Sequence, residues 1–540
     1  MRAINFNGFA RRPLLMILLM WVFLTSVNIN KAIHSDDAFH LKAAQHILKD
    51  PLRPMTGTIR WDELEPTPIY VANQPPGLFY MIAGVSLIFG FNEIAFHLLI
   101  SVFSFLALFW FYKLACLVEV QRPLLTLALF GFCPALLVNQ NVHTDVPLLA
   151  LIIGSLYYLL LVQKTKKAKY NLIAILLVTA AIFLKYTALA LLGAIALIFI
   201  LRKEYKNLWF FMIPIGLIVL WSLWNQWEYG GVHILDRKIG ARSTLYERAW
   251  AYVTTLGSIA PFGVISLAYF LKKNLSLFIV YVSAGLLVVI SIFYYFSPAA
   301  YGSGMTPHLE ILFFINGAII LISTFAIVYR KFFRPFSIAT LLNSLYMPVV
   351  VYFGAILIFL ILFAPFMGTR HVLLSIPFIL LLADAAVSKC NTQLLAFSVV
   401  ASFVLSLLLG ISDWEYADFY RNTAQGIMRG MPPGSKVWAT GTSGWTWYAG
   451  ENGMIEHTLE TATPKPGDYL VIPSKLWASK VSSKDPFTVI AKIWGEVTPL
   501  NYVAVSGDAG LYYSKFGRPS WTLSRKPIDT VFVCQFVDKK

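Results

Sequence analysis

The stretch from residue 164 to residue 203 reads KTKKAKYNLIAILLVTAAIFLKYTALALLGAIALIFILRK. A lysine cluster opens it, Arg202 and Lys203 close it, and the apolar part between them is interrupted by Lys185. The apolar part is too long for one comfortable membrane span of about 20 residues. Two short helices that meet at Lys185 would return the chain to its starting side and leave both basic clusters in the cytoplasm. The stretch therefore predicts a helical hairpin with Lys185 at its outer tip.

The composition of the whole chain agrees with a membrane protein. The 540 residues are 58% hydrophobic and only 13% charged, whereas soluble domains contain about 25% charged residues. This excludes a cytosolic enzyme, a disordered regulator and a secreted module. The net charge of +16 follows from basic cytoplasmic loops and needs no nucleic acid as a partner. The four cysteines are scattered and form neither a disulfide framework nor a metal-binding motif.

Hydropathy and loop charge together predict an all-α multi-pass membrane domain over residues 1–411, with about thirteen spanning helices. Among them are helices near residues 124–141, 249–271, 371–387 and 393–410. The first apolar run, Pro13–Ile29, lacks a cleavage pattern and predicts a retained anchor with a cytoplasmic N-terminus. The first outer loop, residues 31–94, contains two interfacial helices, at Asp36–Lys49, with His40 on its polar face, and at Leu78–Phe91.

Residues 412–540 differ from the rest in composition and predict an extracytoplasmic α/β domain. A helical pattern covers Tyr416–Met431, and strand patterns cover Lys436–Thr440, Tyr469–Ile472 and Thr530–Phe536.

Polar side chains near the outer membrane face are the candidates for chemistry, because charge beside a bilayer is costly. Asp36 and Asp37 stand together just after the first helix. Ser35 could cap the following helix, and the two carboxylates could merely complement its dipole. A carboxylate at this place could equally act as the general base for an acceptor hydroxyl.

Other candidates lie at outer turns and helix ends. Asp145 could open a helix, or it could bind sugar hydroxyls or a divalent cation, Mg²⁺ or Mn²⁺. Lys185 could extend its amine to the interface, or it could bind a lipid phosphate. Arg370 and His371 are further candidates for phosphate binding. The candidates for substrate or metal binding are His143, Gln74, His308 and Glu310.

The order of these motifs resembles a known family. Asp36-Asp37, Gln74-Pro75-Pro76-Gly77-Leu78-Phe79-Tyr80, His143-Thr144-Asp145, Leu184-Lys185-Tyr186-Thr187 and Thr369-Arg370-His371 follow one another on the same side of the membrane. This resembles the GT-C integral-membrane glycosyltransferases, and among them the protein O-mannosyltransferases and the lipid A aminoarabinose transferase. Gln74 departs from the family, in which His or Lys often precedes the two prolines.

The resemblance implies an enzyme with a GT-C fold that transfers a sugar from a polyprenyl-phosphate donor at the outer membrane face. It implies Asp36 as the catalytic base, Asp37 as its neighbour, and Asp145 and Lys185 as counterparts of family residues. The expected reaction is an inverting transfer to the hydroxyl of a lipid, protein or polysaccharide acceptor. No cofactor is firmly expected.

Two other classes remain open from the sequence. A lipid or polysaccharide transporter would also have many helices and outer polar residues, but it would carry charges deep within its helices and often internal repeats. A non-catalytic assembly protein would use the outer domain for partners. The expected location is a cell membrane, and the absence of an Asn-x-Ser/Thr glycosylation site from the outer tail favours the bacterial plasma membrane.

Overall fold

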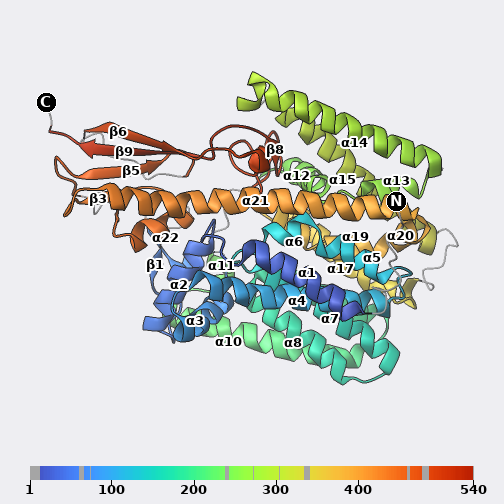
Figure 1. The fold of residues 1–540 in the computed structure, drawn as a ribbon. Helices are drawn as coiled ribbons and strands as arrows, with labels where there is room; N and C mark the ends of the chain where they lie inside the picture. Colours follow the sequence, from blue (N-terminus) through green and yellow to red (C-terminus); the bar gives the residue numbers. More distant parts are fainter. Residues whose placement is uncertain are drawn as a thin grey trace.

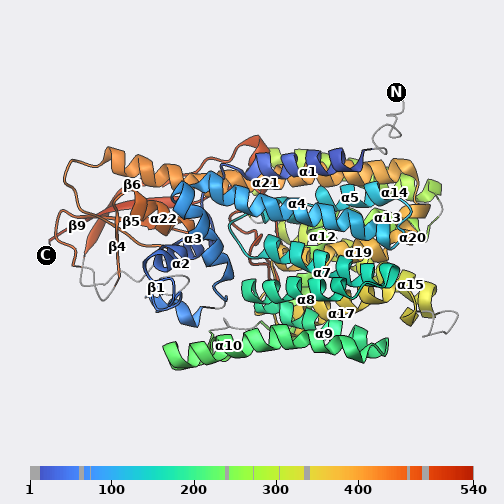
Figure 2. The same ribbon diagram turned by 90° about the horizontal axis from the view of Figure 1, so that it is seen from below.

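The computed structural model describes residues 12–59, 66–72, 74–237, 243–271, 273–302, 305–333, 341–458, 463–476 and 486–538. Most of these residues are helical, and the helices pack into a bundle from which a β-sheet projects at one end (Figure 1). The view in Figure 2 shows the same division between bundle and sheet. The predicted combination of a helical membrane part and a C-terminal part with strands is confirmed at this level.

Seven of the described helices are long and apolar enough to cross a membrane. They are α4 (Glu93–Leu117), α7 (Asp145–Thr165), α10 with the turn before it (Tyr205–Tyr229), α14 (Lys273–Phe296), α15 (Thr306–Val328), α17 (Tyr346–Phe363) and α21 (Thr392–Gly430). Shorter apolar helices include α1 (Pro13–Asn28), α3 (Gly77–Phe89), α8 (Lys169–Leu184) and α9 (Leu189–Leu201). The multi-pass architecture is confirmed, whereas the number of about thirteen spans stays a prediction.

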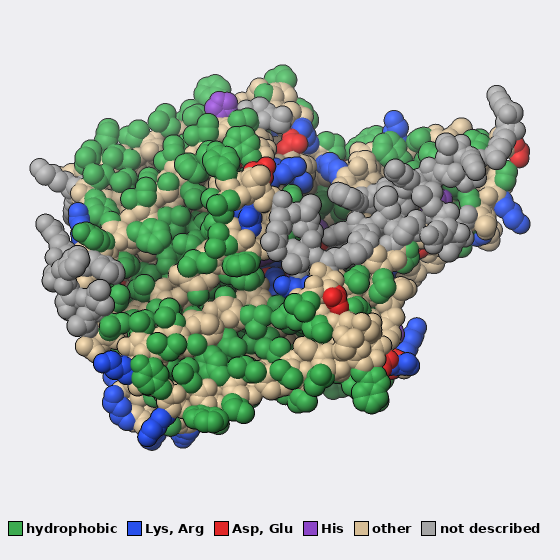
Figure 3. Space-filling model, turned by 180° about the vertical axis from the view of Figure 1, so that it is seen from behind, with side chains coloured by type: hydrophobic (Ala, Val, Ile, Leu, Met, Phe, Trp, Pro, Cys, Tyr) green, Lys and Arg blue, Asp and Glu red, His purple; other side chains and the backbone are tan. Residues whose placement is uncertain are grey.

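The outer surface of the bundle is apolar. On α14, Phe278, Phe293 and Phe296 are 65%, 75% and 78% exposed. Hydrophobic side chains cover most of the helical part, and Lys and Arg side chains gather at the end far from the sheet (Figure 3). A soluble protein rarely exposes so large an apolar area, so lipid must surround these helices.

Three predicted spans, near residues 124–141, 249–271 and 371–387, are not continuous helices. Each is divided into shorter pieces: α5 (Pro123–Gly131) and α6 (Pro134–Val138); α12 (Leu245–Ile259) and α13 (Gly263–Ala268); α18 (Thr369–Leu373), α19 (Ile376–Leu382) and α20 (Asp384–Lys389). Pro134 and Pro261 stand at the first two breaks and Pro377 just after one in the third, where the missing N–H interrupts the helical ladder. Apolar length alone does not reveal such breaks.

The hairpin predicted around Lys185 is present. Helix α8 ends at Leu184, Lys185 is extended (φ −160°, ψ 127°), and a 3₁₀ turn over Tyr186–Ala188 leads into α9. Lys185 thus occupies the tip of the hairpin, between the end of α8 and the 3₁₀ turn.

Helices α2 (Asp37–Lys49), α3 and α22 (Gly444–Glu451) lie together at the end of the bundle nearest the sheet (Figures 1 and 2). One hydrophobic core continues from the bundle through this region into the sheet, since Phe79, Leu41, Trp445 and Val471 belong to the same buried cluster. The C-terminal part is therefore packed directly on the first outer loop.

Helix α21 joins the two parts of the molecule. The sequence predicts one helix up to residue 410 and another from Tyr416, but the structure has a single helix of 39 residues. Gly410 lies within this helix and allows close packing against α6, since a Cβ there would lie 2.5 Å from Leu137 Cδ2. The predicted boundary at 411/412 falls inside this helix and stays a prediction.

The C-terminal sheet has five strands in the order β4-β3-β5-β9-β6. The strands are β3 (Val437–Ala439), β4 (Ile455–Glu456), β5 (Tyr469–Pro473), β6 (Phe487–Trp494) and β9 (Thr530–Phe536). Strand β3 pairs in parallel with β4 and β5, whereas β9 pairs antiparallel with β5 and β6. The three strands predicted from their sequence patterns are thus found as β3, β5 and β9. Two short antiparallel pairs, β1 (Thr58–Ile59) with β2 (Thr67–Pro68) and β7 (Val503–Ala504) with β8 (Thr522–Leu523), lie outside this sheet.

Candidate active site

The paired aspartates stand where the first outer loop turns into α2. Asp36 occupies the N-cap position, but its side chain makes no capping hydrogen bond. Ser35, the residue predicted to cap the helix, has a left-handed backbone conformation with φ 51°. This conformation is uncommon for a residue with a side chain, and it turns the chain sharply just before Asp36. The two neighbouring carboxylates then enter different surroundings.

Asp36 forms an ion pair with Arg370 of α18. Arg370 Nη1 donates to Asp36 Oδ2 at 2.6 Å, and the two side chains are 9% and 13% exposed. Burial by itself would raise the pKa of Asp36, but the adjacent guanidinium outweighs burial and holds this pKa well below its usual range. Asp36 is therefore a carboxylate that can be reached from outside the core and carries a firm negative charge.

Asp37 is completely buried on the other side of the turn. The backbone N–H of His34 donates to Asp37 Oδ2 at 3.0 Å, and His143 Nε2 lies 3.1 Å from Asp37 Oδ1. Burial raises the pKa of Asp37 from 3.8 to about 8. Asp37 is thus a neutral acid at neutral pH, unlike Asp36.

A second ion pair joins the tip of the hairpin to the start of α7. Lys185 Nζ donates to Asp145 Oδ1 at 2.7 Å. Asp145 also interacts electrostatically with Arg370 and His371, so the two ion pairs belong to one polar cluster. Four of the candidates from separate motifs, Asp36, Asp145, Lys185 and Arg370, are therefore brought together by the fold.

The cluster contains buried nitrogen atoms with no hydrogen-bond partner among the described residues. They are Arg370 Nε, which is a donor, and His371 Nδ1, which donates or accepts according to its tautomer. Unpaired buried polar atoms are costly and usually mark a place for a ligand or water. Beside Lys185, they form a site suited to an anion with several oxygen atoms.

Gln74 and His143 lie next to this cluster. Gln74 Oε1 lies 3.0 Å from His40 Nε2, and Val142 O lies 2.7 Å from His40 Nδ1. The sequence predicts His40 on the polar face of a surface helix, but it is fully buried. His40 thus links Gln74 to Val142, which directly precedes His143.

His308 and Glu310 are not part of the cluster described above. Glu310 accepts hydrogen bonds from Trp250 Nε1 at 2.9 Å and from the backbone N–H of Gly517 at 2.9 Å. His308 is exposed near the start of α15. Glu310 thus connects α15 with α12 and the C-terminal segment rather than with Asp36.

Sequence reasoning missed a third buried ion pair nearby. Lys31 Nζ donates to Asp413 Oδ2 at 2.8 Å, and the hydroxyl of Tyr512 donates to the same oxygen at 2.8 Å. Tyr512 also accepts from Asn141 Nδ2 at 2.7 Å. A lysine on the outer side of the first helix and an aspartate within the last one were the available signals, because both are unfavourable at a membrane edge without a partner.

Asp37, His40 and His143 form a buried group that could hold a metal ion, since one ligand atom of each lies within 4.8 Å of the others. Asp37 Oδ1 and His143 Nε2 face each other without a hydrogen bond. However, Arg370 Nη1 lies 3.3 Å from His143 Nδ1, and an arginine can only donate. His143 then carries its proton on Nε2, which leaves no lone pair there for a metal. The arrangement as it stands does not fit a metal ion.

Residues 73–225 match the family model of the dolichyl-phosphate-mannose-protein mannosyltransferases. This segment contains Gln74, His143, Asp145 and Lys185. The match identifies an integral-membrane glycosyltransferase of the class that uses a lipid-phosphate sugar donor, which confirms the enzyme class and the resemblance predicted from the sequence. No curated protein sequence matches the chain.

The chain is similar in structure to several solved proteins. The oligosaccharyltransferase of Archaeoglobus fulgidus, in complex with Zn and sulfate, is 13% identical, with 85% of this chain and 68% of that chain covered and a TM-score of 0.46. ArnT from Cupriavidus metallidurans bound to undecaprenyl phosphate is 11% identical, with 98% of each chain covered and a TM-score of 0.41.

Proposed function

We propose that this chain transfers a sugar from a polyprenyl-phosphate donor to an acceptor hydroxyl at the extracytoplasmic membrane face, with inversion, in a GT-C fold. The observation that carries the proposal is the cluster of Asp36, Arg370, Asp145 and Lys185, in which a carboxylate that can be reached by substrate adjoins two cations and unpaired nitrogen atoms. Base and phosphate site thus lie side by side.

The proposed reaction is a single displacement. Asp36 accepts the proton of the acceptor hydroxyl, whose oxygen attacks the anomeric carbon while the bond from that carbon to the phosphate oxygen breaks. Polyprenyl phosphate leaves, and one displacement inverts the configuration. Arg370 and Lys185 offset the charge that develops on the leaving phosphate.

The Asp36–Arg370 ion pair adds a control step to this proposal. While Arg370 is paired with Asp36, it lowers the pKa of the carboxyl and makes it a weak base. A donor phosphate competes for the guanidinium, so donor binding would restore the basicity of Asp36. Base activity would then depend on the presence of the donor.

Asp37 and His143 support the base in this scheme. Asp37 is neutral and holds the turn through its contact with the His34 N–H, and His143 accepts from Arg370. No step is assigned to a metal ion, because His143 does not offer a lone pair to one in this arrangement.

We further propose that the catalytic membrane unit is residues 1–411 and the outer unit residues 412–540, in a bacterial plasma membrane with the N-terminus inside. Cysteine labelling of intact cells tests this sidedness. A Gly450→Cys thiol should react with an impermeant reagent, and a Lys167→Cys thiol should not; labelling at 167 would refute the thirteen-helix topology, which rests on positive loops inside.

The function itself is tested with purified protein and a radiolabelled polyprenyl-phosphate sugar. The expected result is release of polyprenyl phosphate and transfer of the label to a hydroxyl acceptor. A transporter or an assembly protein would leave the donor intact, so an uncleaved donor would refute the proposal.

A further inference from the structure

The segment of residues 509–518 lies between β7 and β8 and returns from the C-terminal part to the helical bundle. Its two ends are joined, because Arg518 Nε donates to Ala509 O at 2.9 Å. Near its end, the N–H of Gly517 donates to Glu310 Oε1 of α15 at 2.9 Å. The segment is therefore a closed loop that is fixed to the bundle.

The 509–518 segment pairs with the chain that directly precedes Arg370. Two backbone hydrogen bonds make this pairing: Ser514 N–H donates to Met367 O at 2.7 Å, and Thr369 N–H donates to Leu511 O at 3.1 Å. Between these bonds the two chains approach so closely that a Cβ on Gly368 would clash with Tyr512 O. The segment thus fixes the start of α18, which carries Arg370.

The side chain of Tyr512 extends from the segment to the two other outer turns of the site. Its hydroxyl accepts from Asn141 Nδ2 at 2.7 Å, and Asn141 stands four positions before Asp145. Its ring meets the ring of His34, two positions before Asp36, with centroids 5.1 Å apart and an angle of 64°. Tyr512 therefore contacts the turns of both aspartates, and its backbone contacts the chain before α18.

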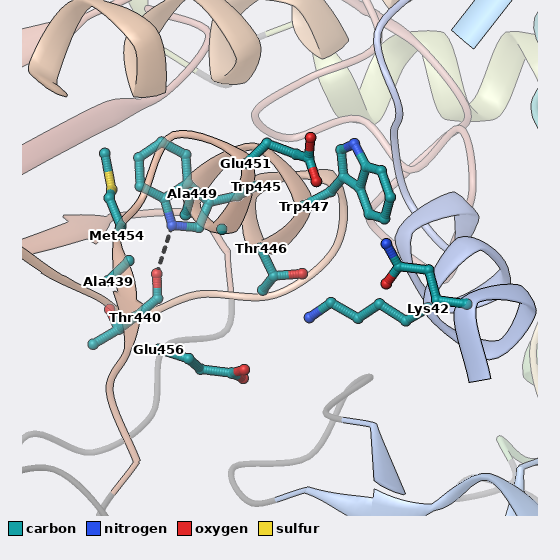
Figure 4. Close-up of a pocket in the computed structure, with 12 residues that line it drawn as sticks. Lys42, Ala439, Thr440, Trp445, Thr446, Trp447, Ala449, Glu451, Met454 and Glu456 are labelled. Carbon is teal, nitrogen blue, oxygen red and sulfur yellow. Dashed lines mark hydrogen bonds between the residues drawn. The ribbon is translucent and has the colours of Figure 1, made fainter. Parts of the chain in front are cut away.

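The C-terminal part also holds the first of these turns from α22. Tyr448 accepts from the N–H of Ile33 at 2.6 Å, and a Cβ on Gly444 would clash with Ile33 O. Figure 4 shows the neighbouring contact, in which Lys42 of α2 extends towards Thr446 of α22. The turn that leads into α2 is thus held by the C-terminal part as well as by the bundle.

Sugar transfer requires the base and the phosphate-binding side chains to be in place at the same time. Asp36, Asp145 and Arg370 come from three turns that are far apart in the sequence. A misplacement of about 1 Å can lower a rate about 100-fold. A fixed segment that contacts all three turns limits their movement relative to one another.

We propose that the 509–518 segment holds the base and the phosphate-binding residues in their relative positions, and that Tyr512 is the positioning residue that joins them. The inference rests on the proposed transferase function. It adds that the outer unit, residues 412–540, is required for the displacement itself. Tyr512 acts through Asn141 and His34 and takes no part in the bond changes.

Two variants test this role in the full-length protein in lipid nanodiscs, with the donor-cleavage assay described above. Tyr512→Phe removes the hydroxyl and keeps the ring. Gly368→Ala forces the segment away from α18 and removes no functional group. At matched amounts of folded protein, the rate at saturating donor should fall about 10- to 100-fold in each. The donor KM of Tyr512→Phe should change less than about threefold, because Lys185 and Arg370 remain.

Matched controls make the same substitutions on α17. Tyr352→Phe removes a buried hydroxyl that shares a hydrogen bond of 2.8 Å with Ser155. Gly354→Ala adds a Cβ that meets nothing within 4 Å. Both controls should cleave the donor at the wild-type rate, since α17 carries none of the three turns.

Hydrogen exchange measures the hold on the turns without any donor. Peptides that cover residues 33–37 and 367–371 should exchange faster in Tyr512→Phe and Gly368→Ala, whereas peptides from α4 should keep the wild-type rate. Acceleration throughout the chain would indicate a merely structural role and would overturn the inference. Wild-type cleavage rates in both variants, or equal losses in the controls, would also overturn it. If the wild type cleaves the donor in these cases, the proposed function stands and only the role of Tyr512 falls; a wild type that leaves the donor intact refutes the proposed function itself.

Discussion

Two buried ion pairs lie five residues apart at the start of the first outer loop, and they differ in access. Lys31 and Asp413 have side chains that are 1% and 0% exposed, whereas Arg370 and Asp36 are 9% and 13% exposed. The first pair is sealed between the loop, α21 and Tyr512. The second adjoins Arg370 Nε and His371 Nδ1, which lack partners among the described residues.

The difference in access separates an ion pair that stabilises the fold from one that can take part in catalysis. A sealed pair cannot meet a substrate, so its value lies in joining α21 and the C-terminal part to the loop. An ion pair that can be reached, with unpaired nitrogen atoms beside it, can exchange one partner for a ligand. The same residue types therefore serve two purposes, and access decides between them.

The largest effect is expected from Asp36→Asn. Asn lacks the charge to accept the proton, so the rate at saturating donor should fall roughly 10²–10⁴-fold. Asp36 makes no capping hydrogen bond, but Asn leaves Arg370 without its ion-pair partner, so some loss of stability should accompany the loss of rate. The measurement is the initial rate at matched amounts of folded protein, and near wild-type activity would show that Asp36 is not the base.

Asp413→Asn should instead damage stability. Removal of one partner from a fully buried ion pair costs about 3–5 kcal/mol, because Lys31 keeps a buried charge. The melting temperature should drop clearly, which scanning fluorimetry measures. The double variant Lys31→Met/Asp413→Leu should recover much of this loss, whereas Asp36→Leu/Arg370→Met should not recover activity. The opposite pattern would reverse the roles of the two pairs.

Lys185→Ala should weaken use of the donor. Loss of a charge-assisted hydrogen bond to phosphate predicts a rise in donor KM of about 10- to 100-fold. Lys185→Arg should lose less, because it keeps the charge and can still pair with Asp145. Lys185→Ala/Asp145→Asn controls for the buried carboxylate that the single change leaves unpaired. If all three variants had the donor KM of the wild type, Lys185 would not bind the donor phosphate and would only extend its amine to the membrane interface.

Asp37→Asn should have the smallest effect at neutral pH, since a neutral amide replaces a neutral acid. The raised pKa of Asp37 means that the folded protein keeps a proton that the unfolded chain releases between about pH 3.8 and about pH 8. The free energy of unfolding should fall as pH rises through this window. Asp37→Asn should flatten this slope in melting temperatures measured across pH, and a loss of activity larger than that of Asp36→Asn would exchange the two assignments.

Local patterns were sufficient for several features. Apolar length and loop charge predicted a multi-pass protein and the hairpin at Lys185, because hydropathy and charge act on each segment separately. A run rich in β-branched and aromatic residues predicted β9 at its observed bounds. Adjacent carboxylates at an outer loop were enough to single out Asp36 and Asp37.

Tertiary structure decided the partners and the states of these residues. Asp36 and Arg370 are 334 positions apart, and no spacing rule links them. Only packing distinguishes a charged Asp36 from a neutral Asp37, because the pKa depends on burial and on the neighbouring guanidinium. Tertiary packing likewise decided the breaks in three spans and the burial of the Lys31–Asp413 pair. Both depend on which distant segments pack together, and no local sequence pattern specifies this.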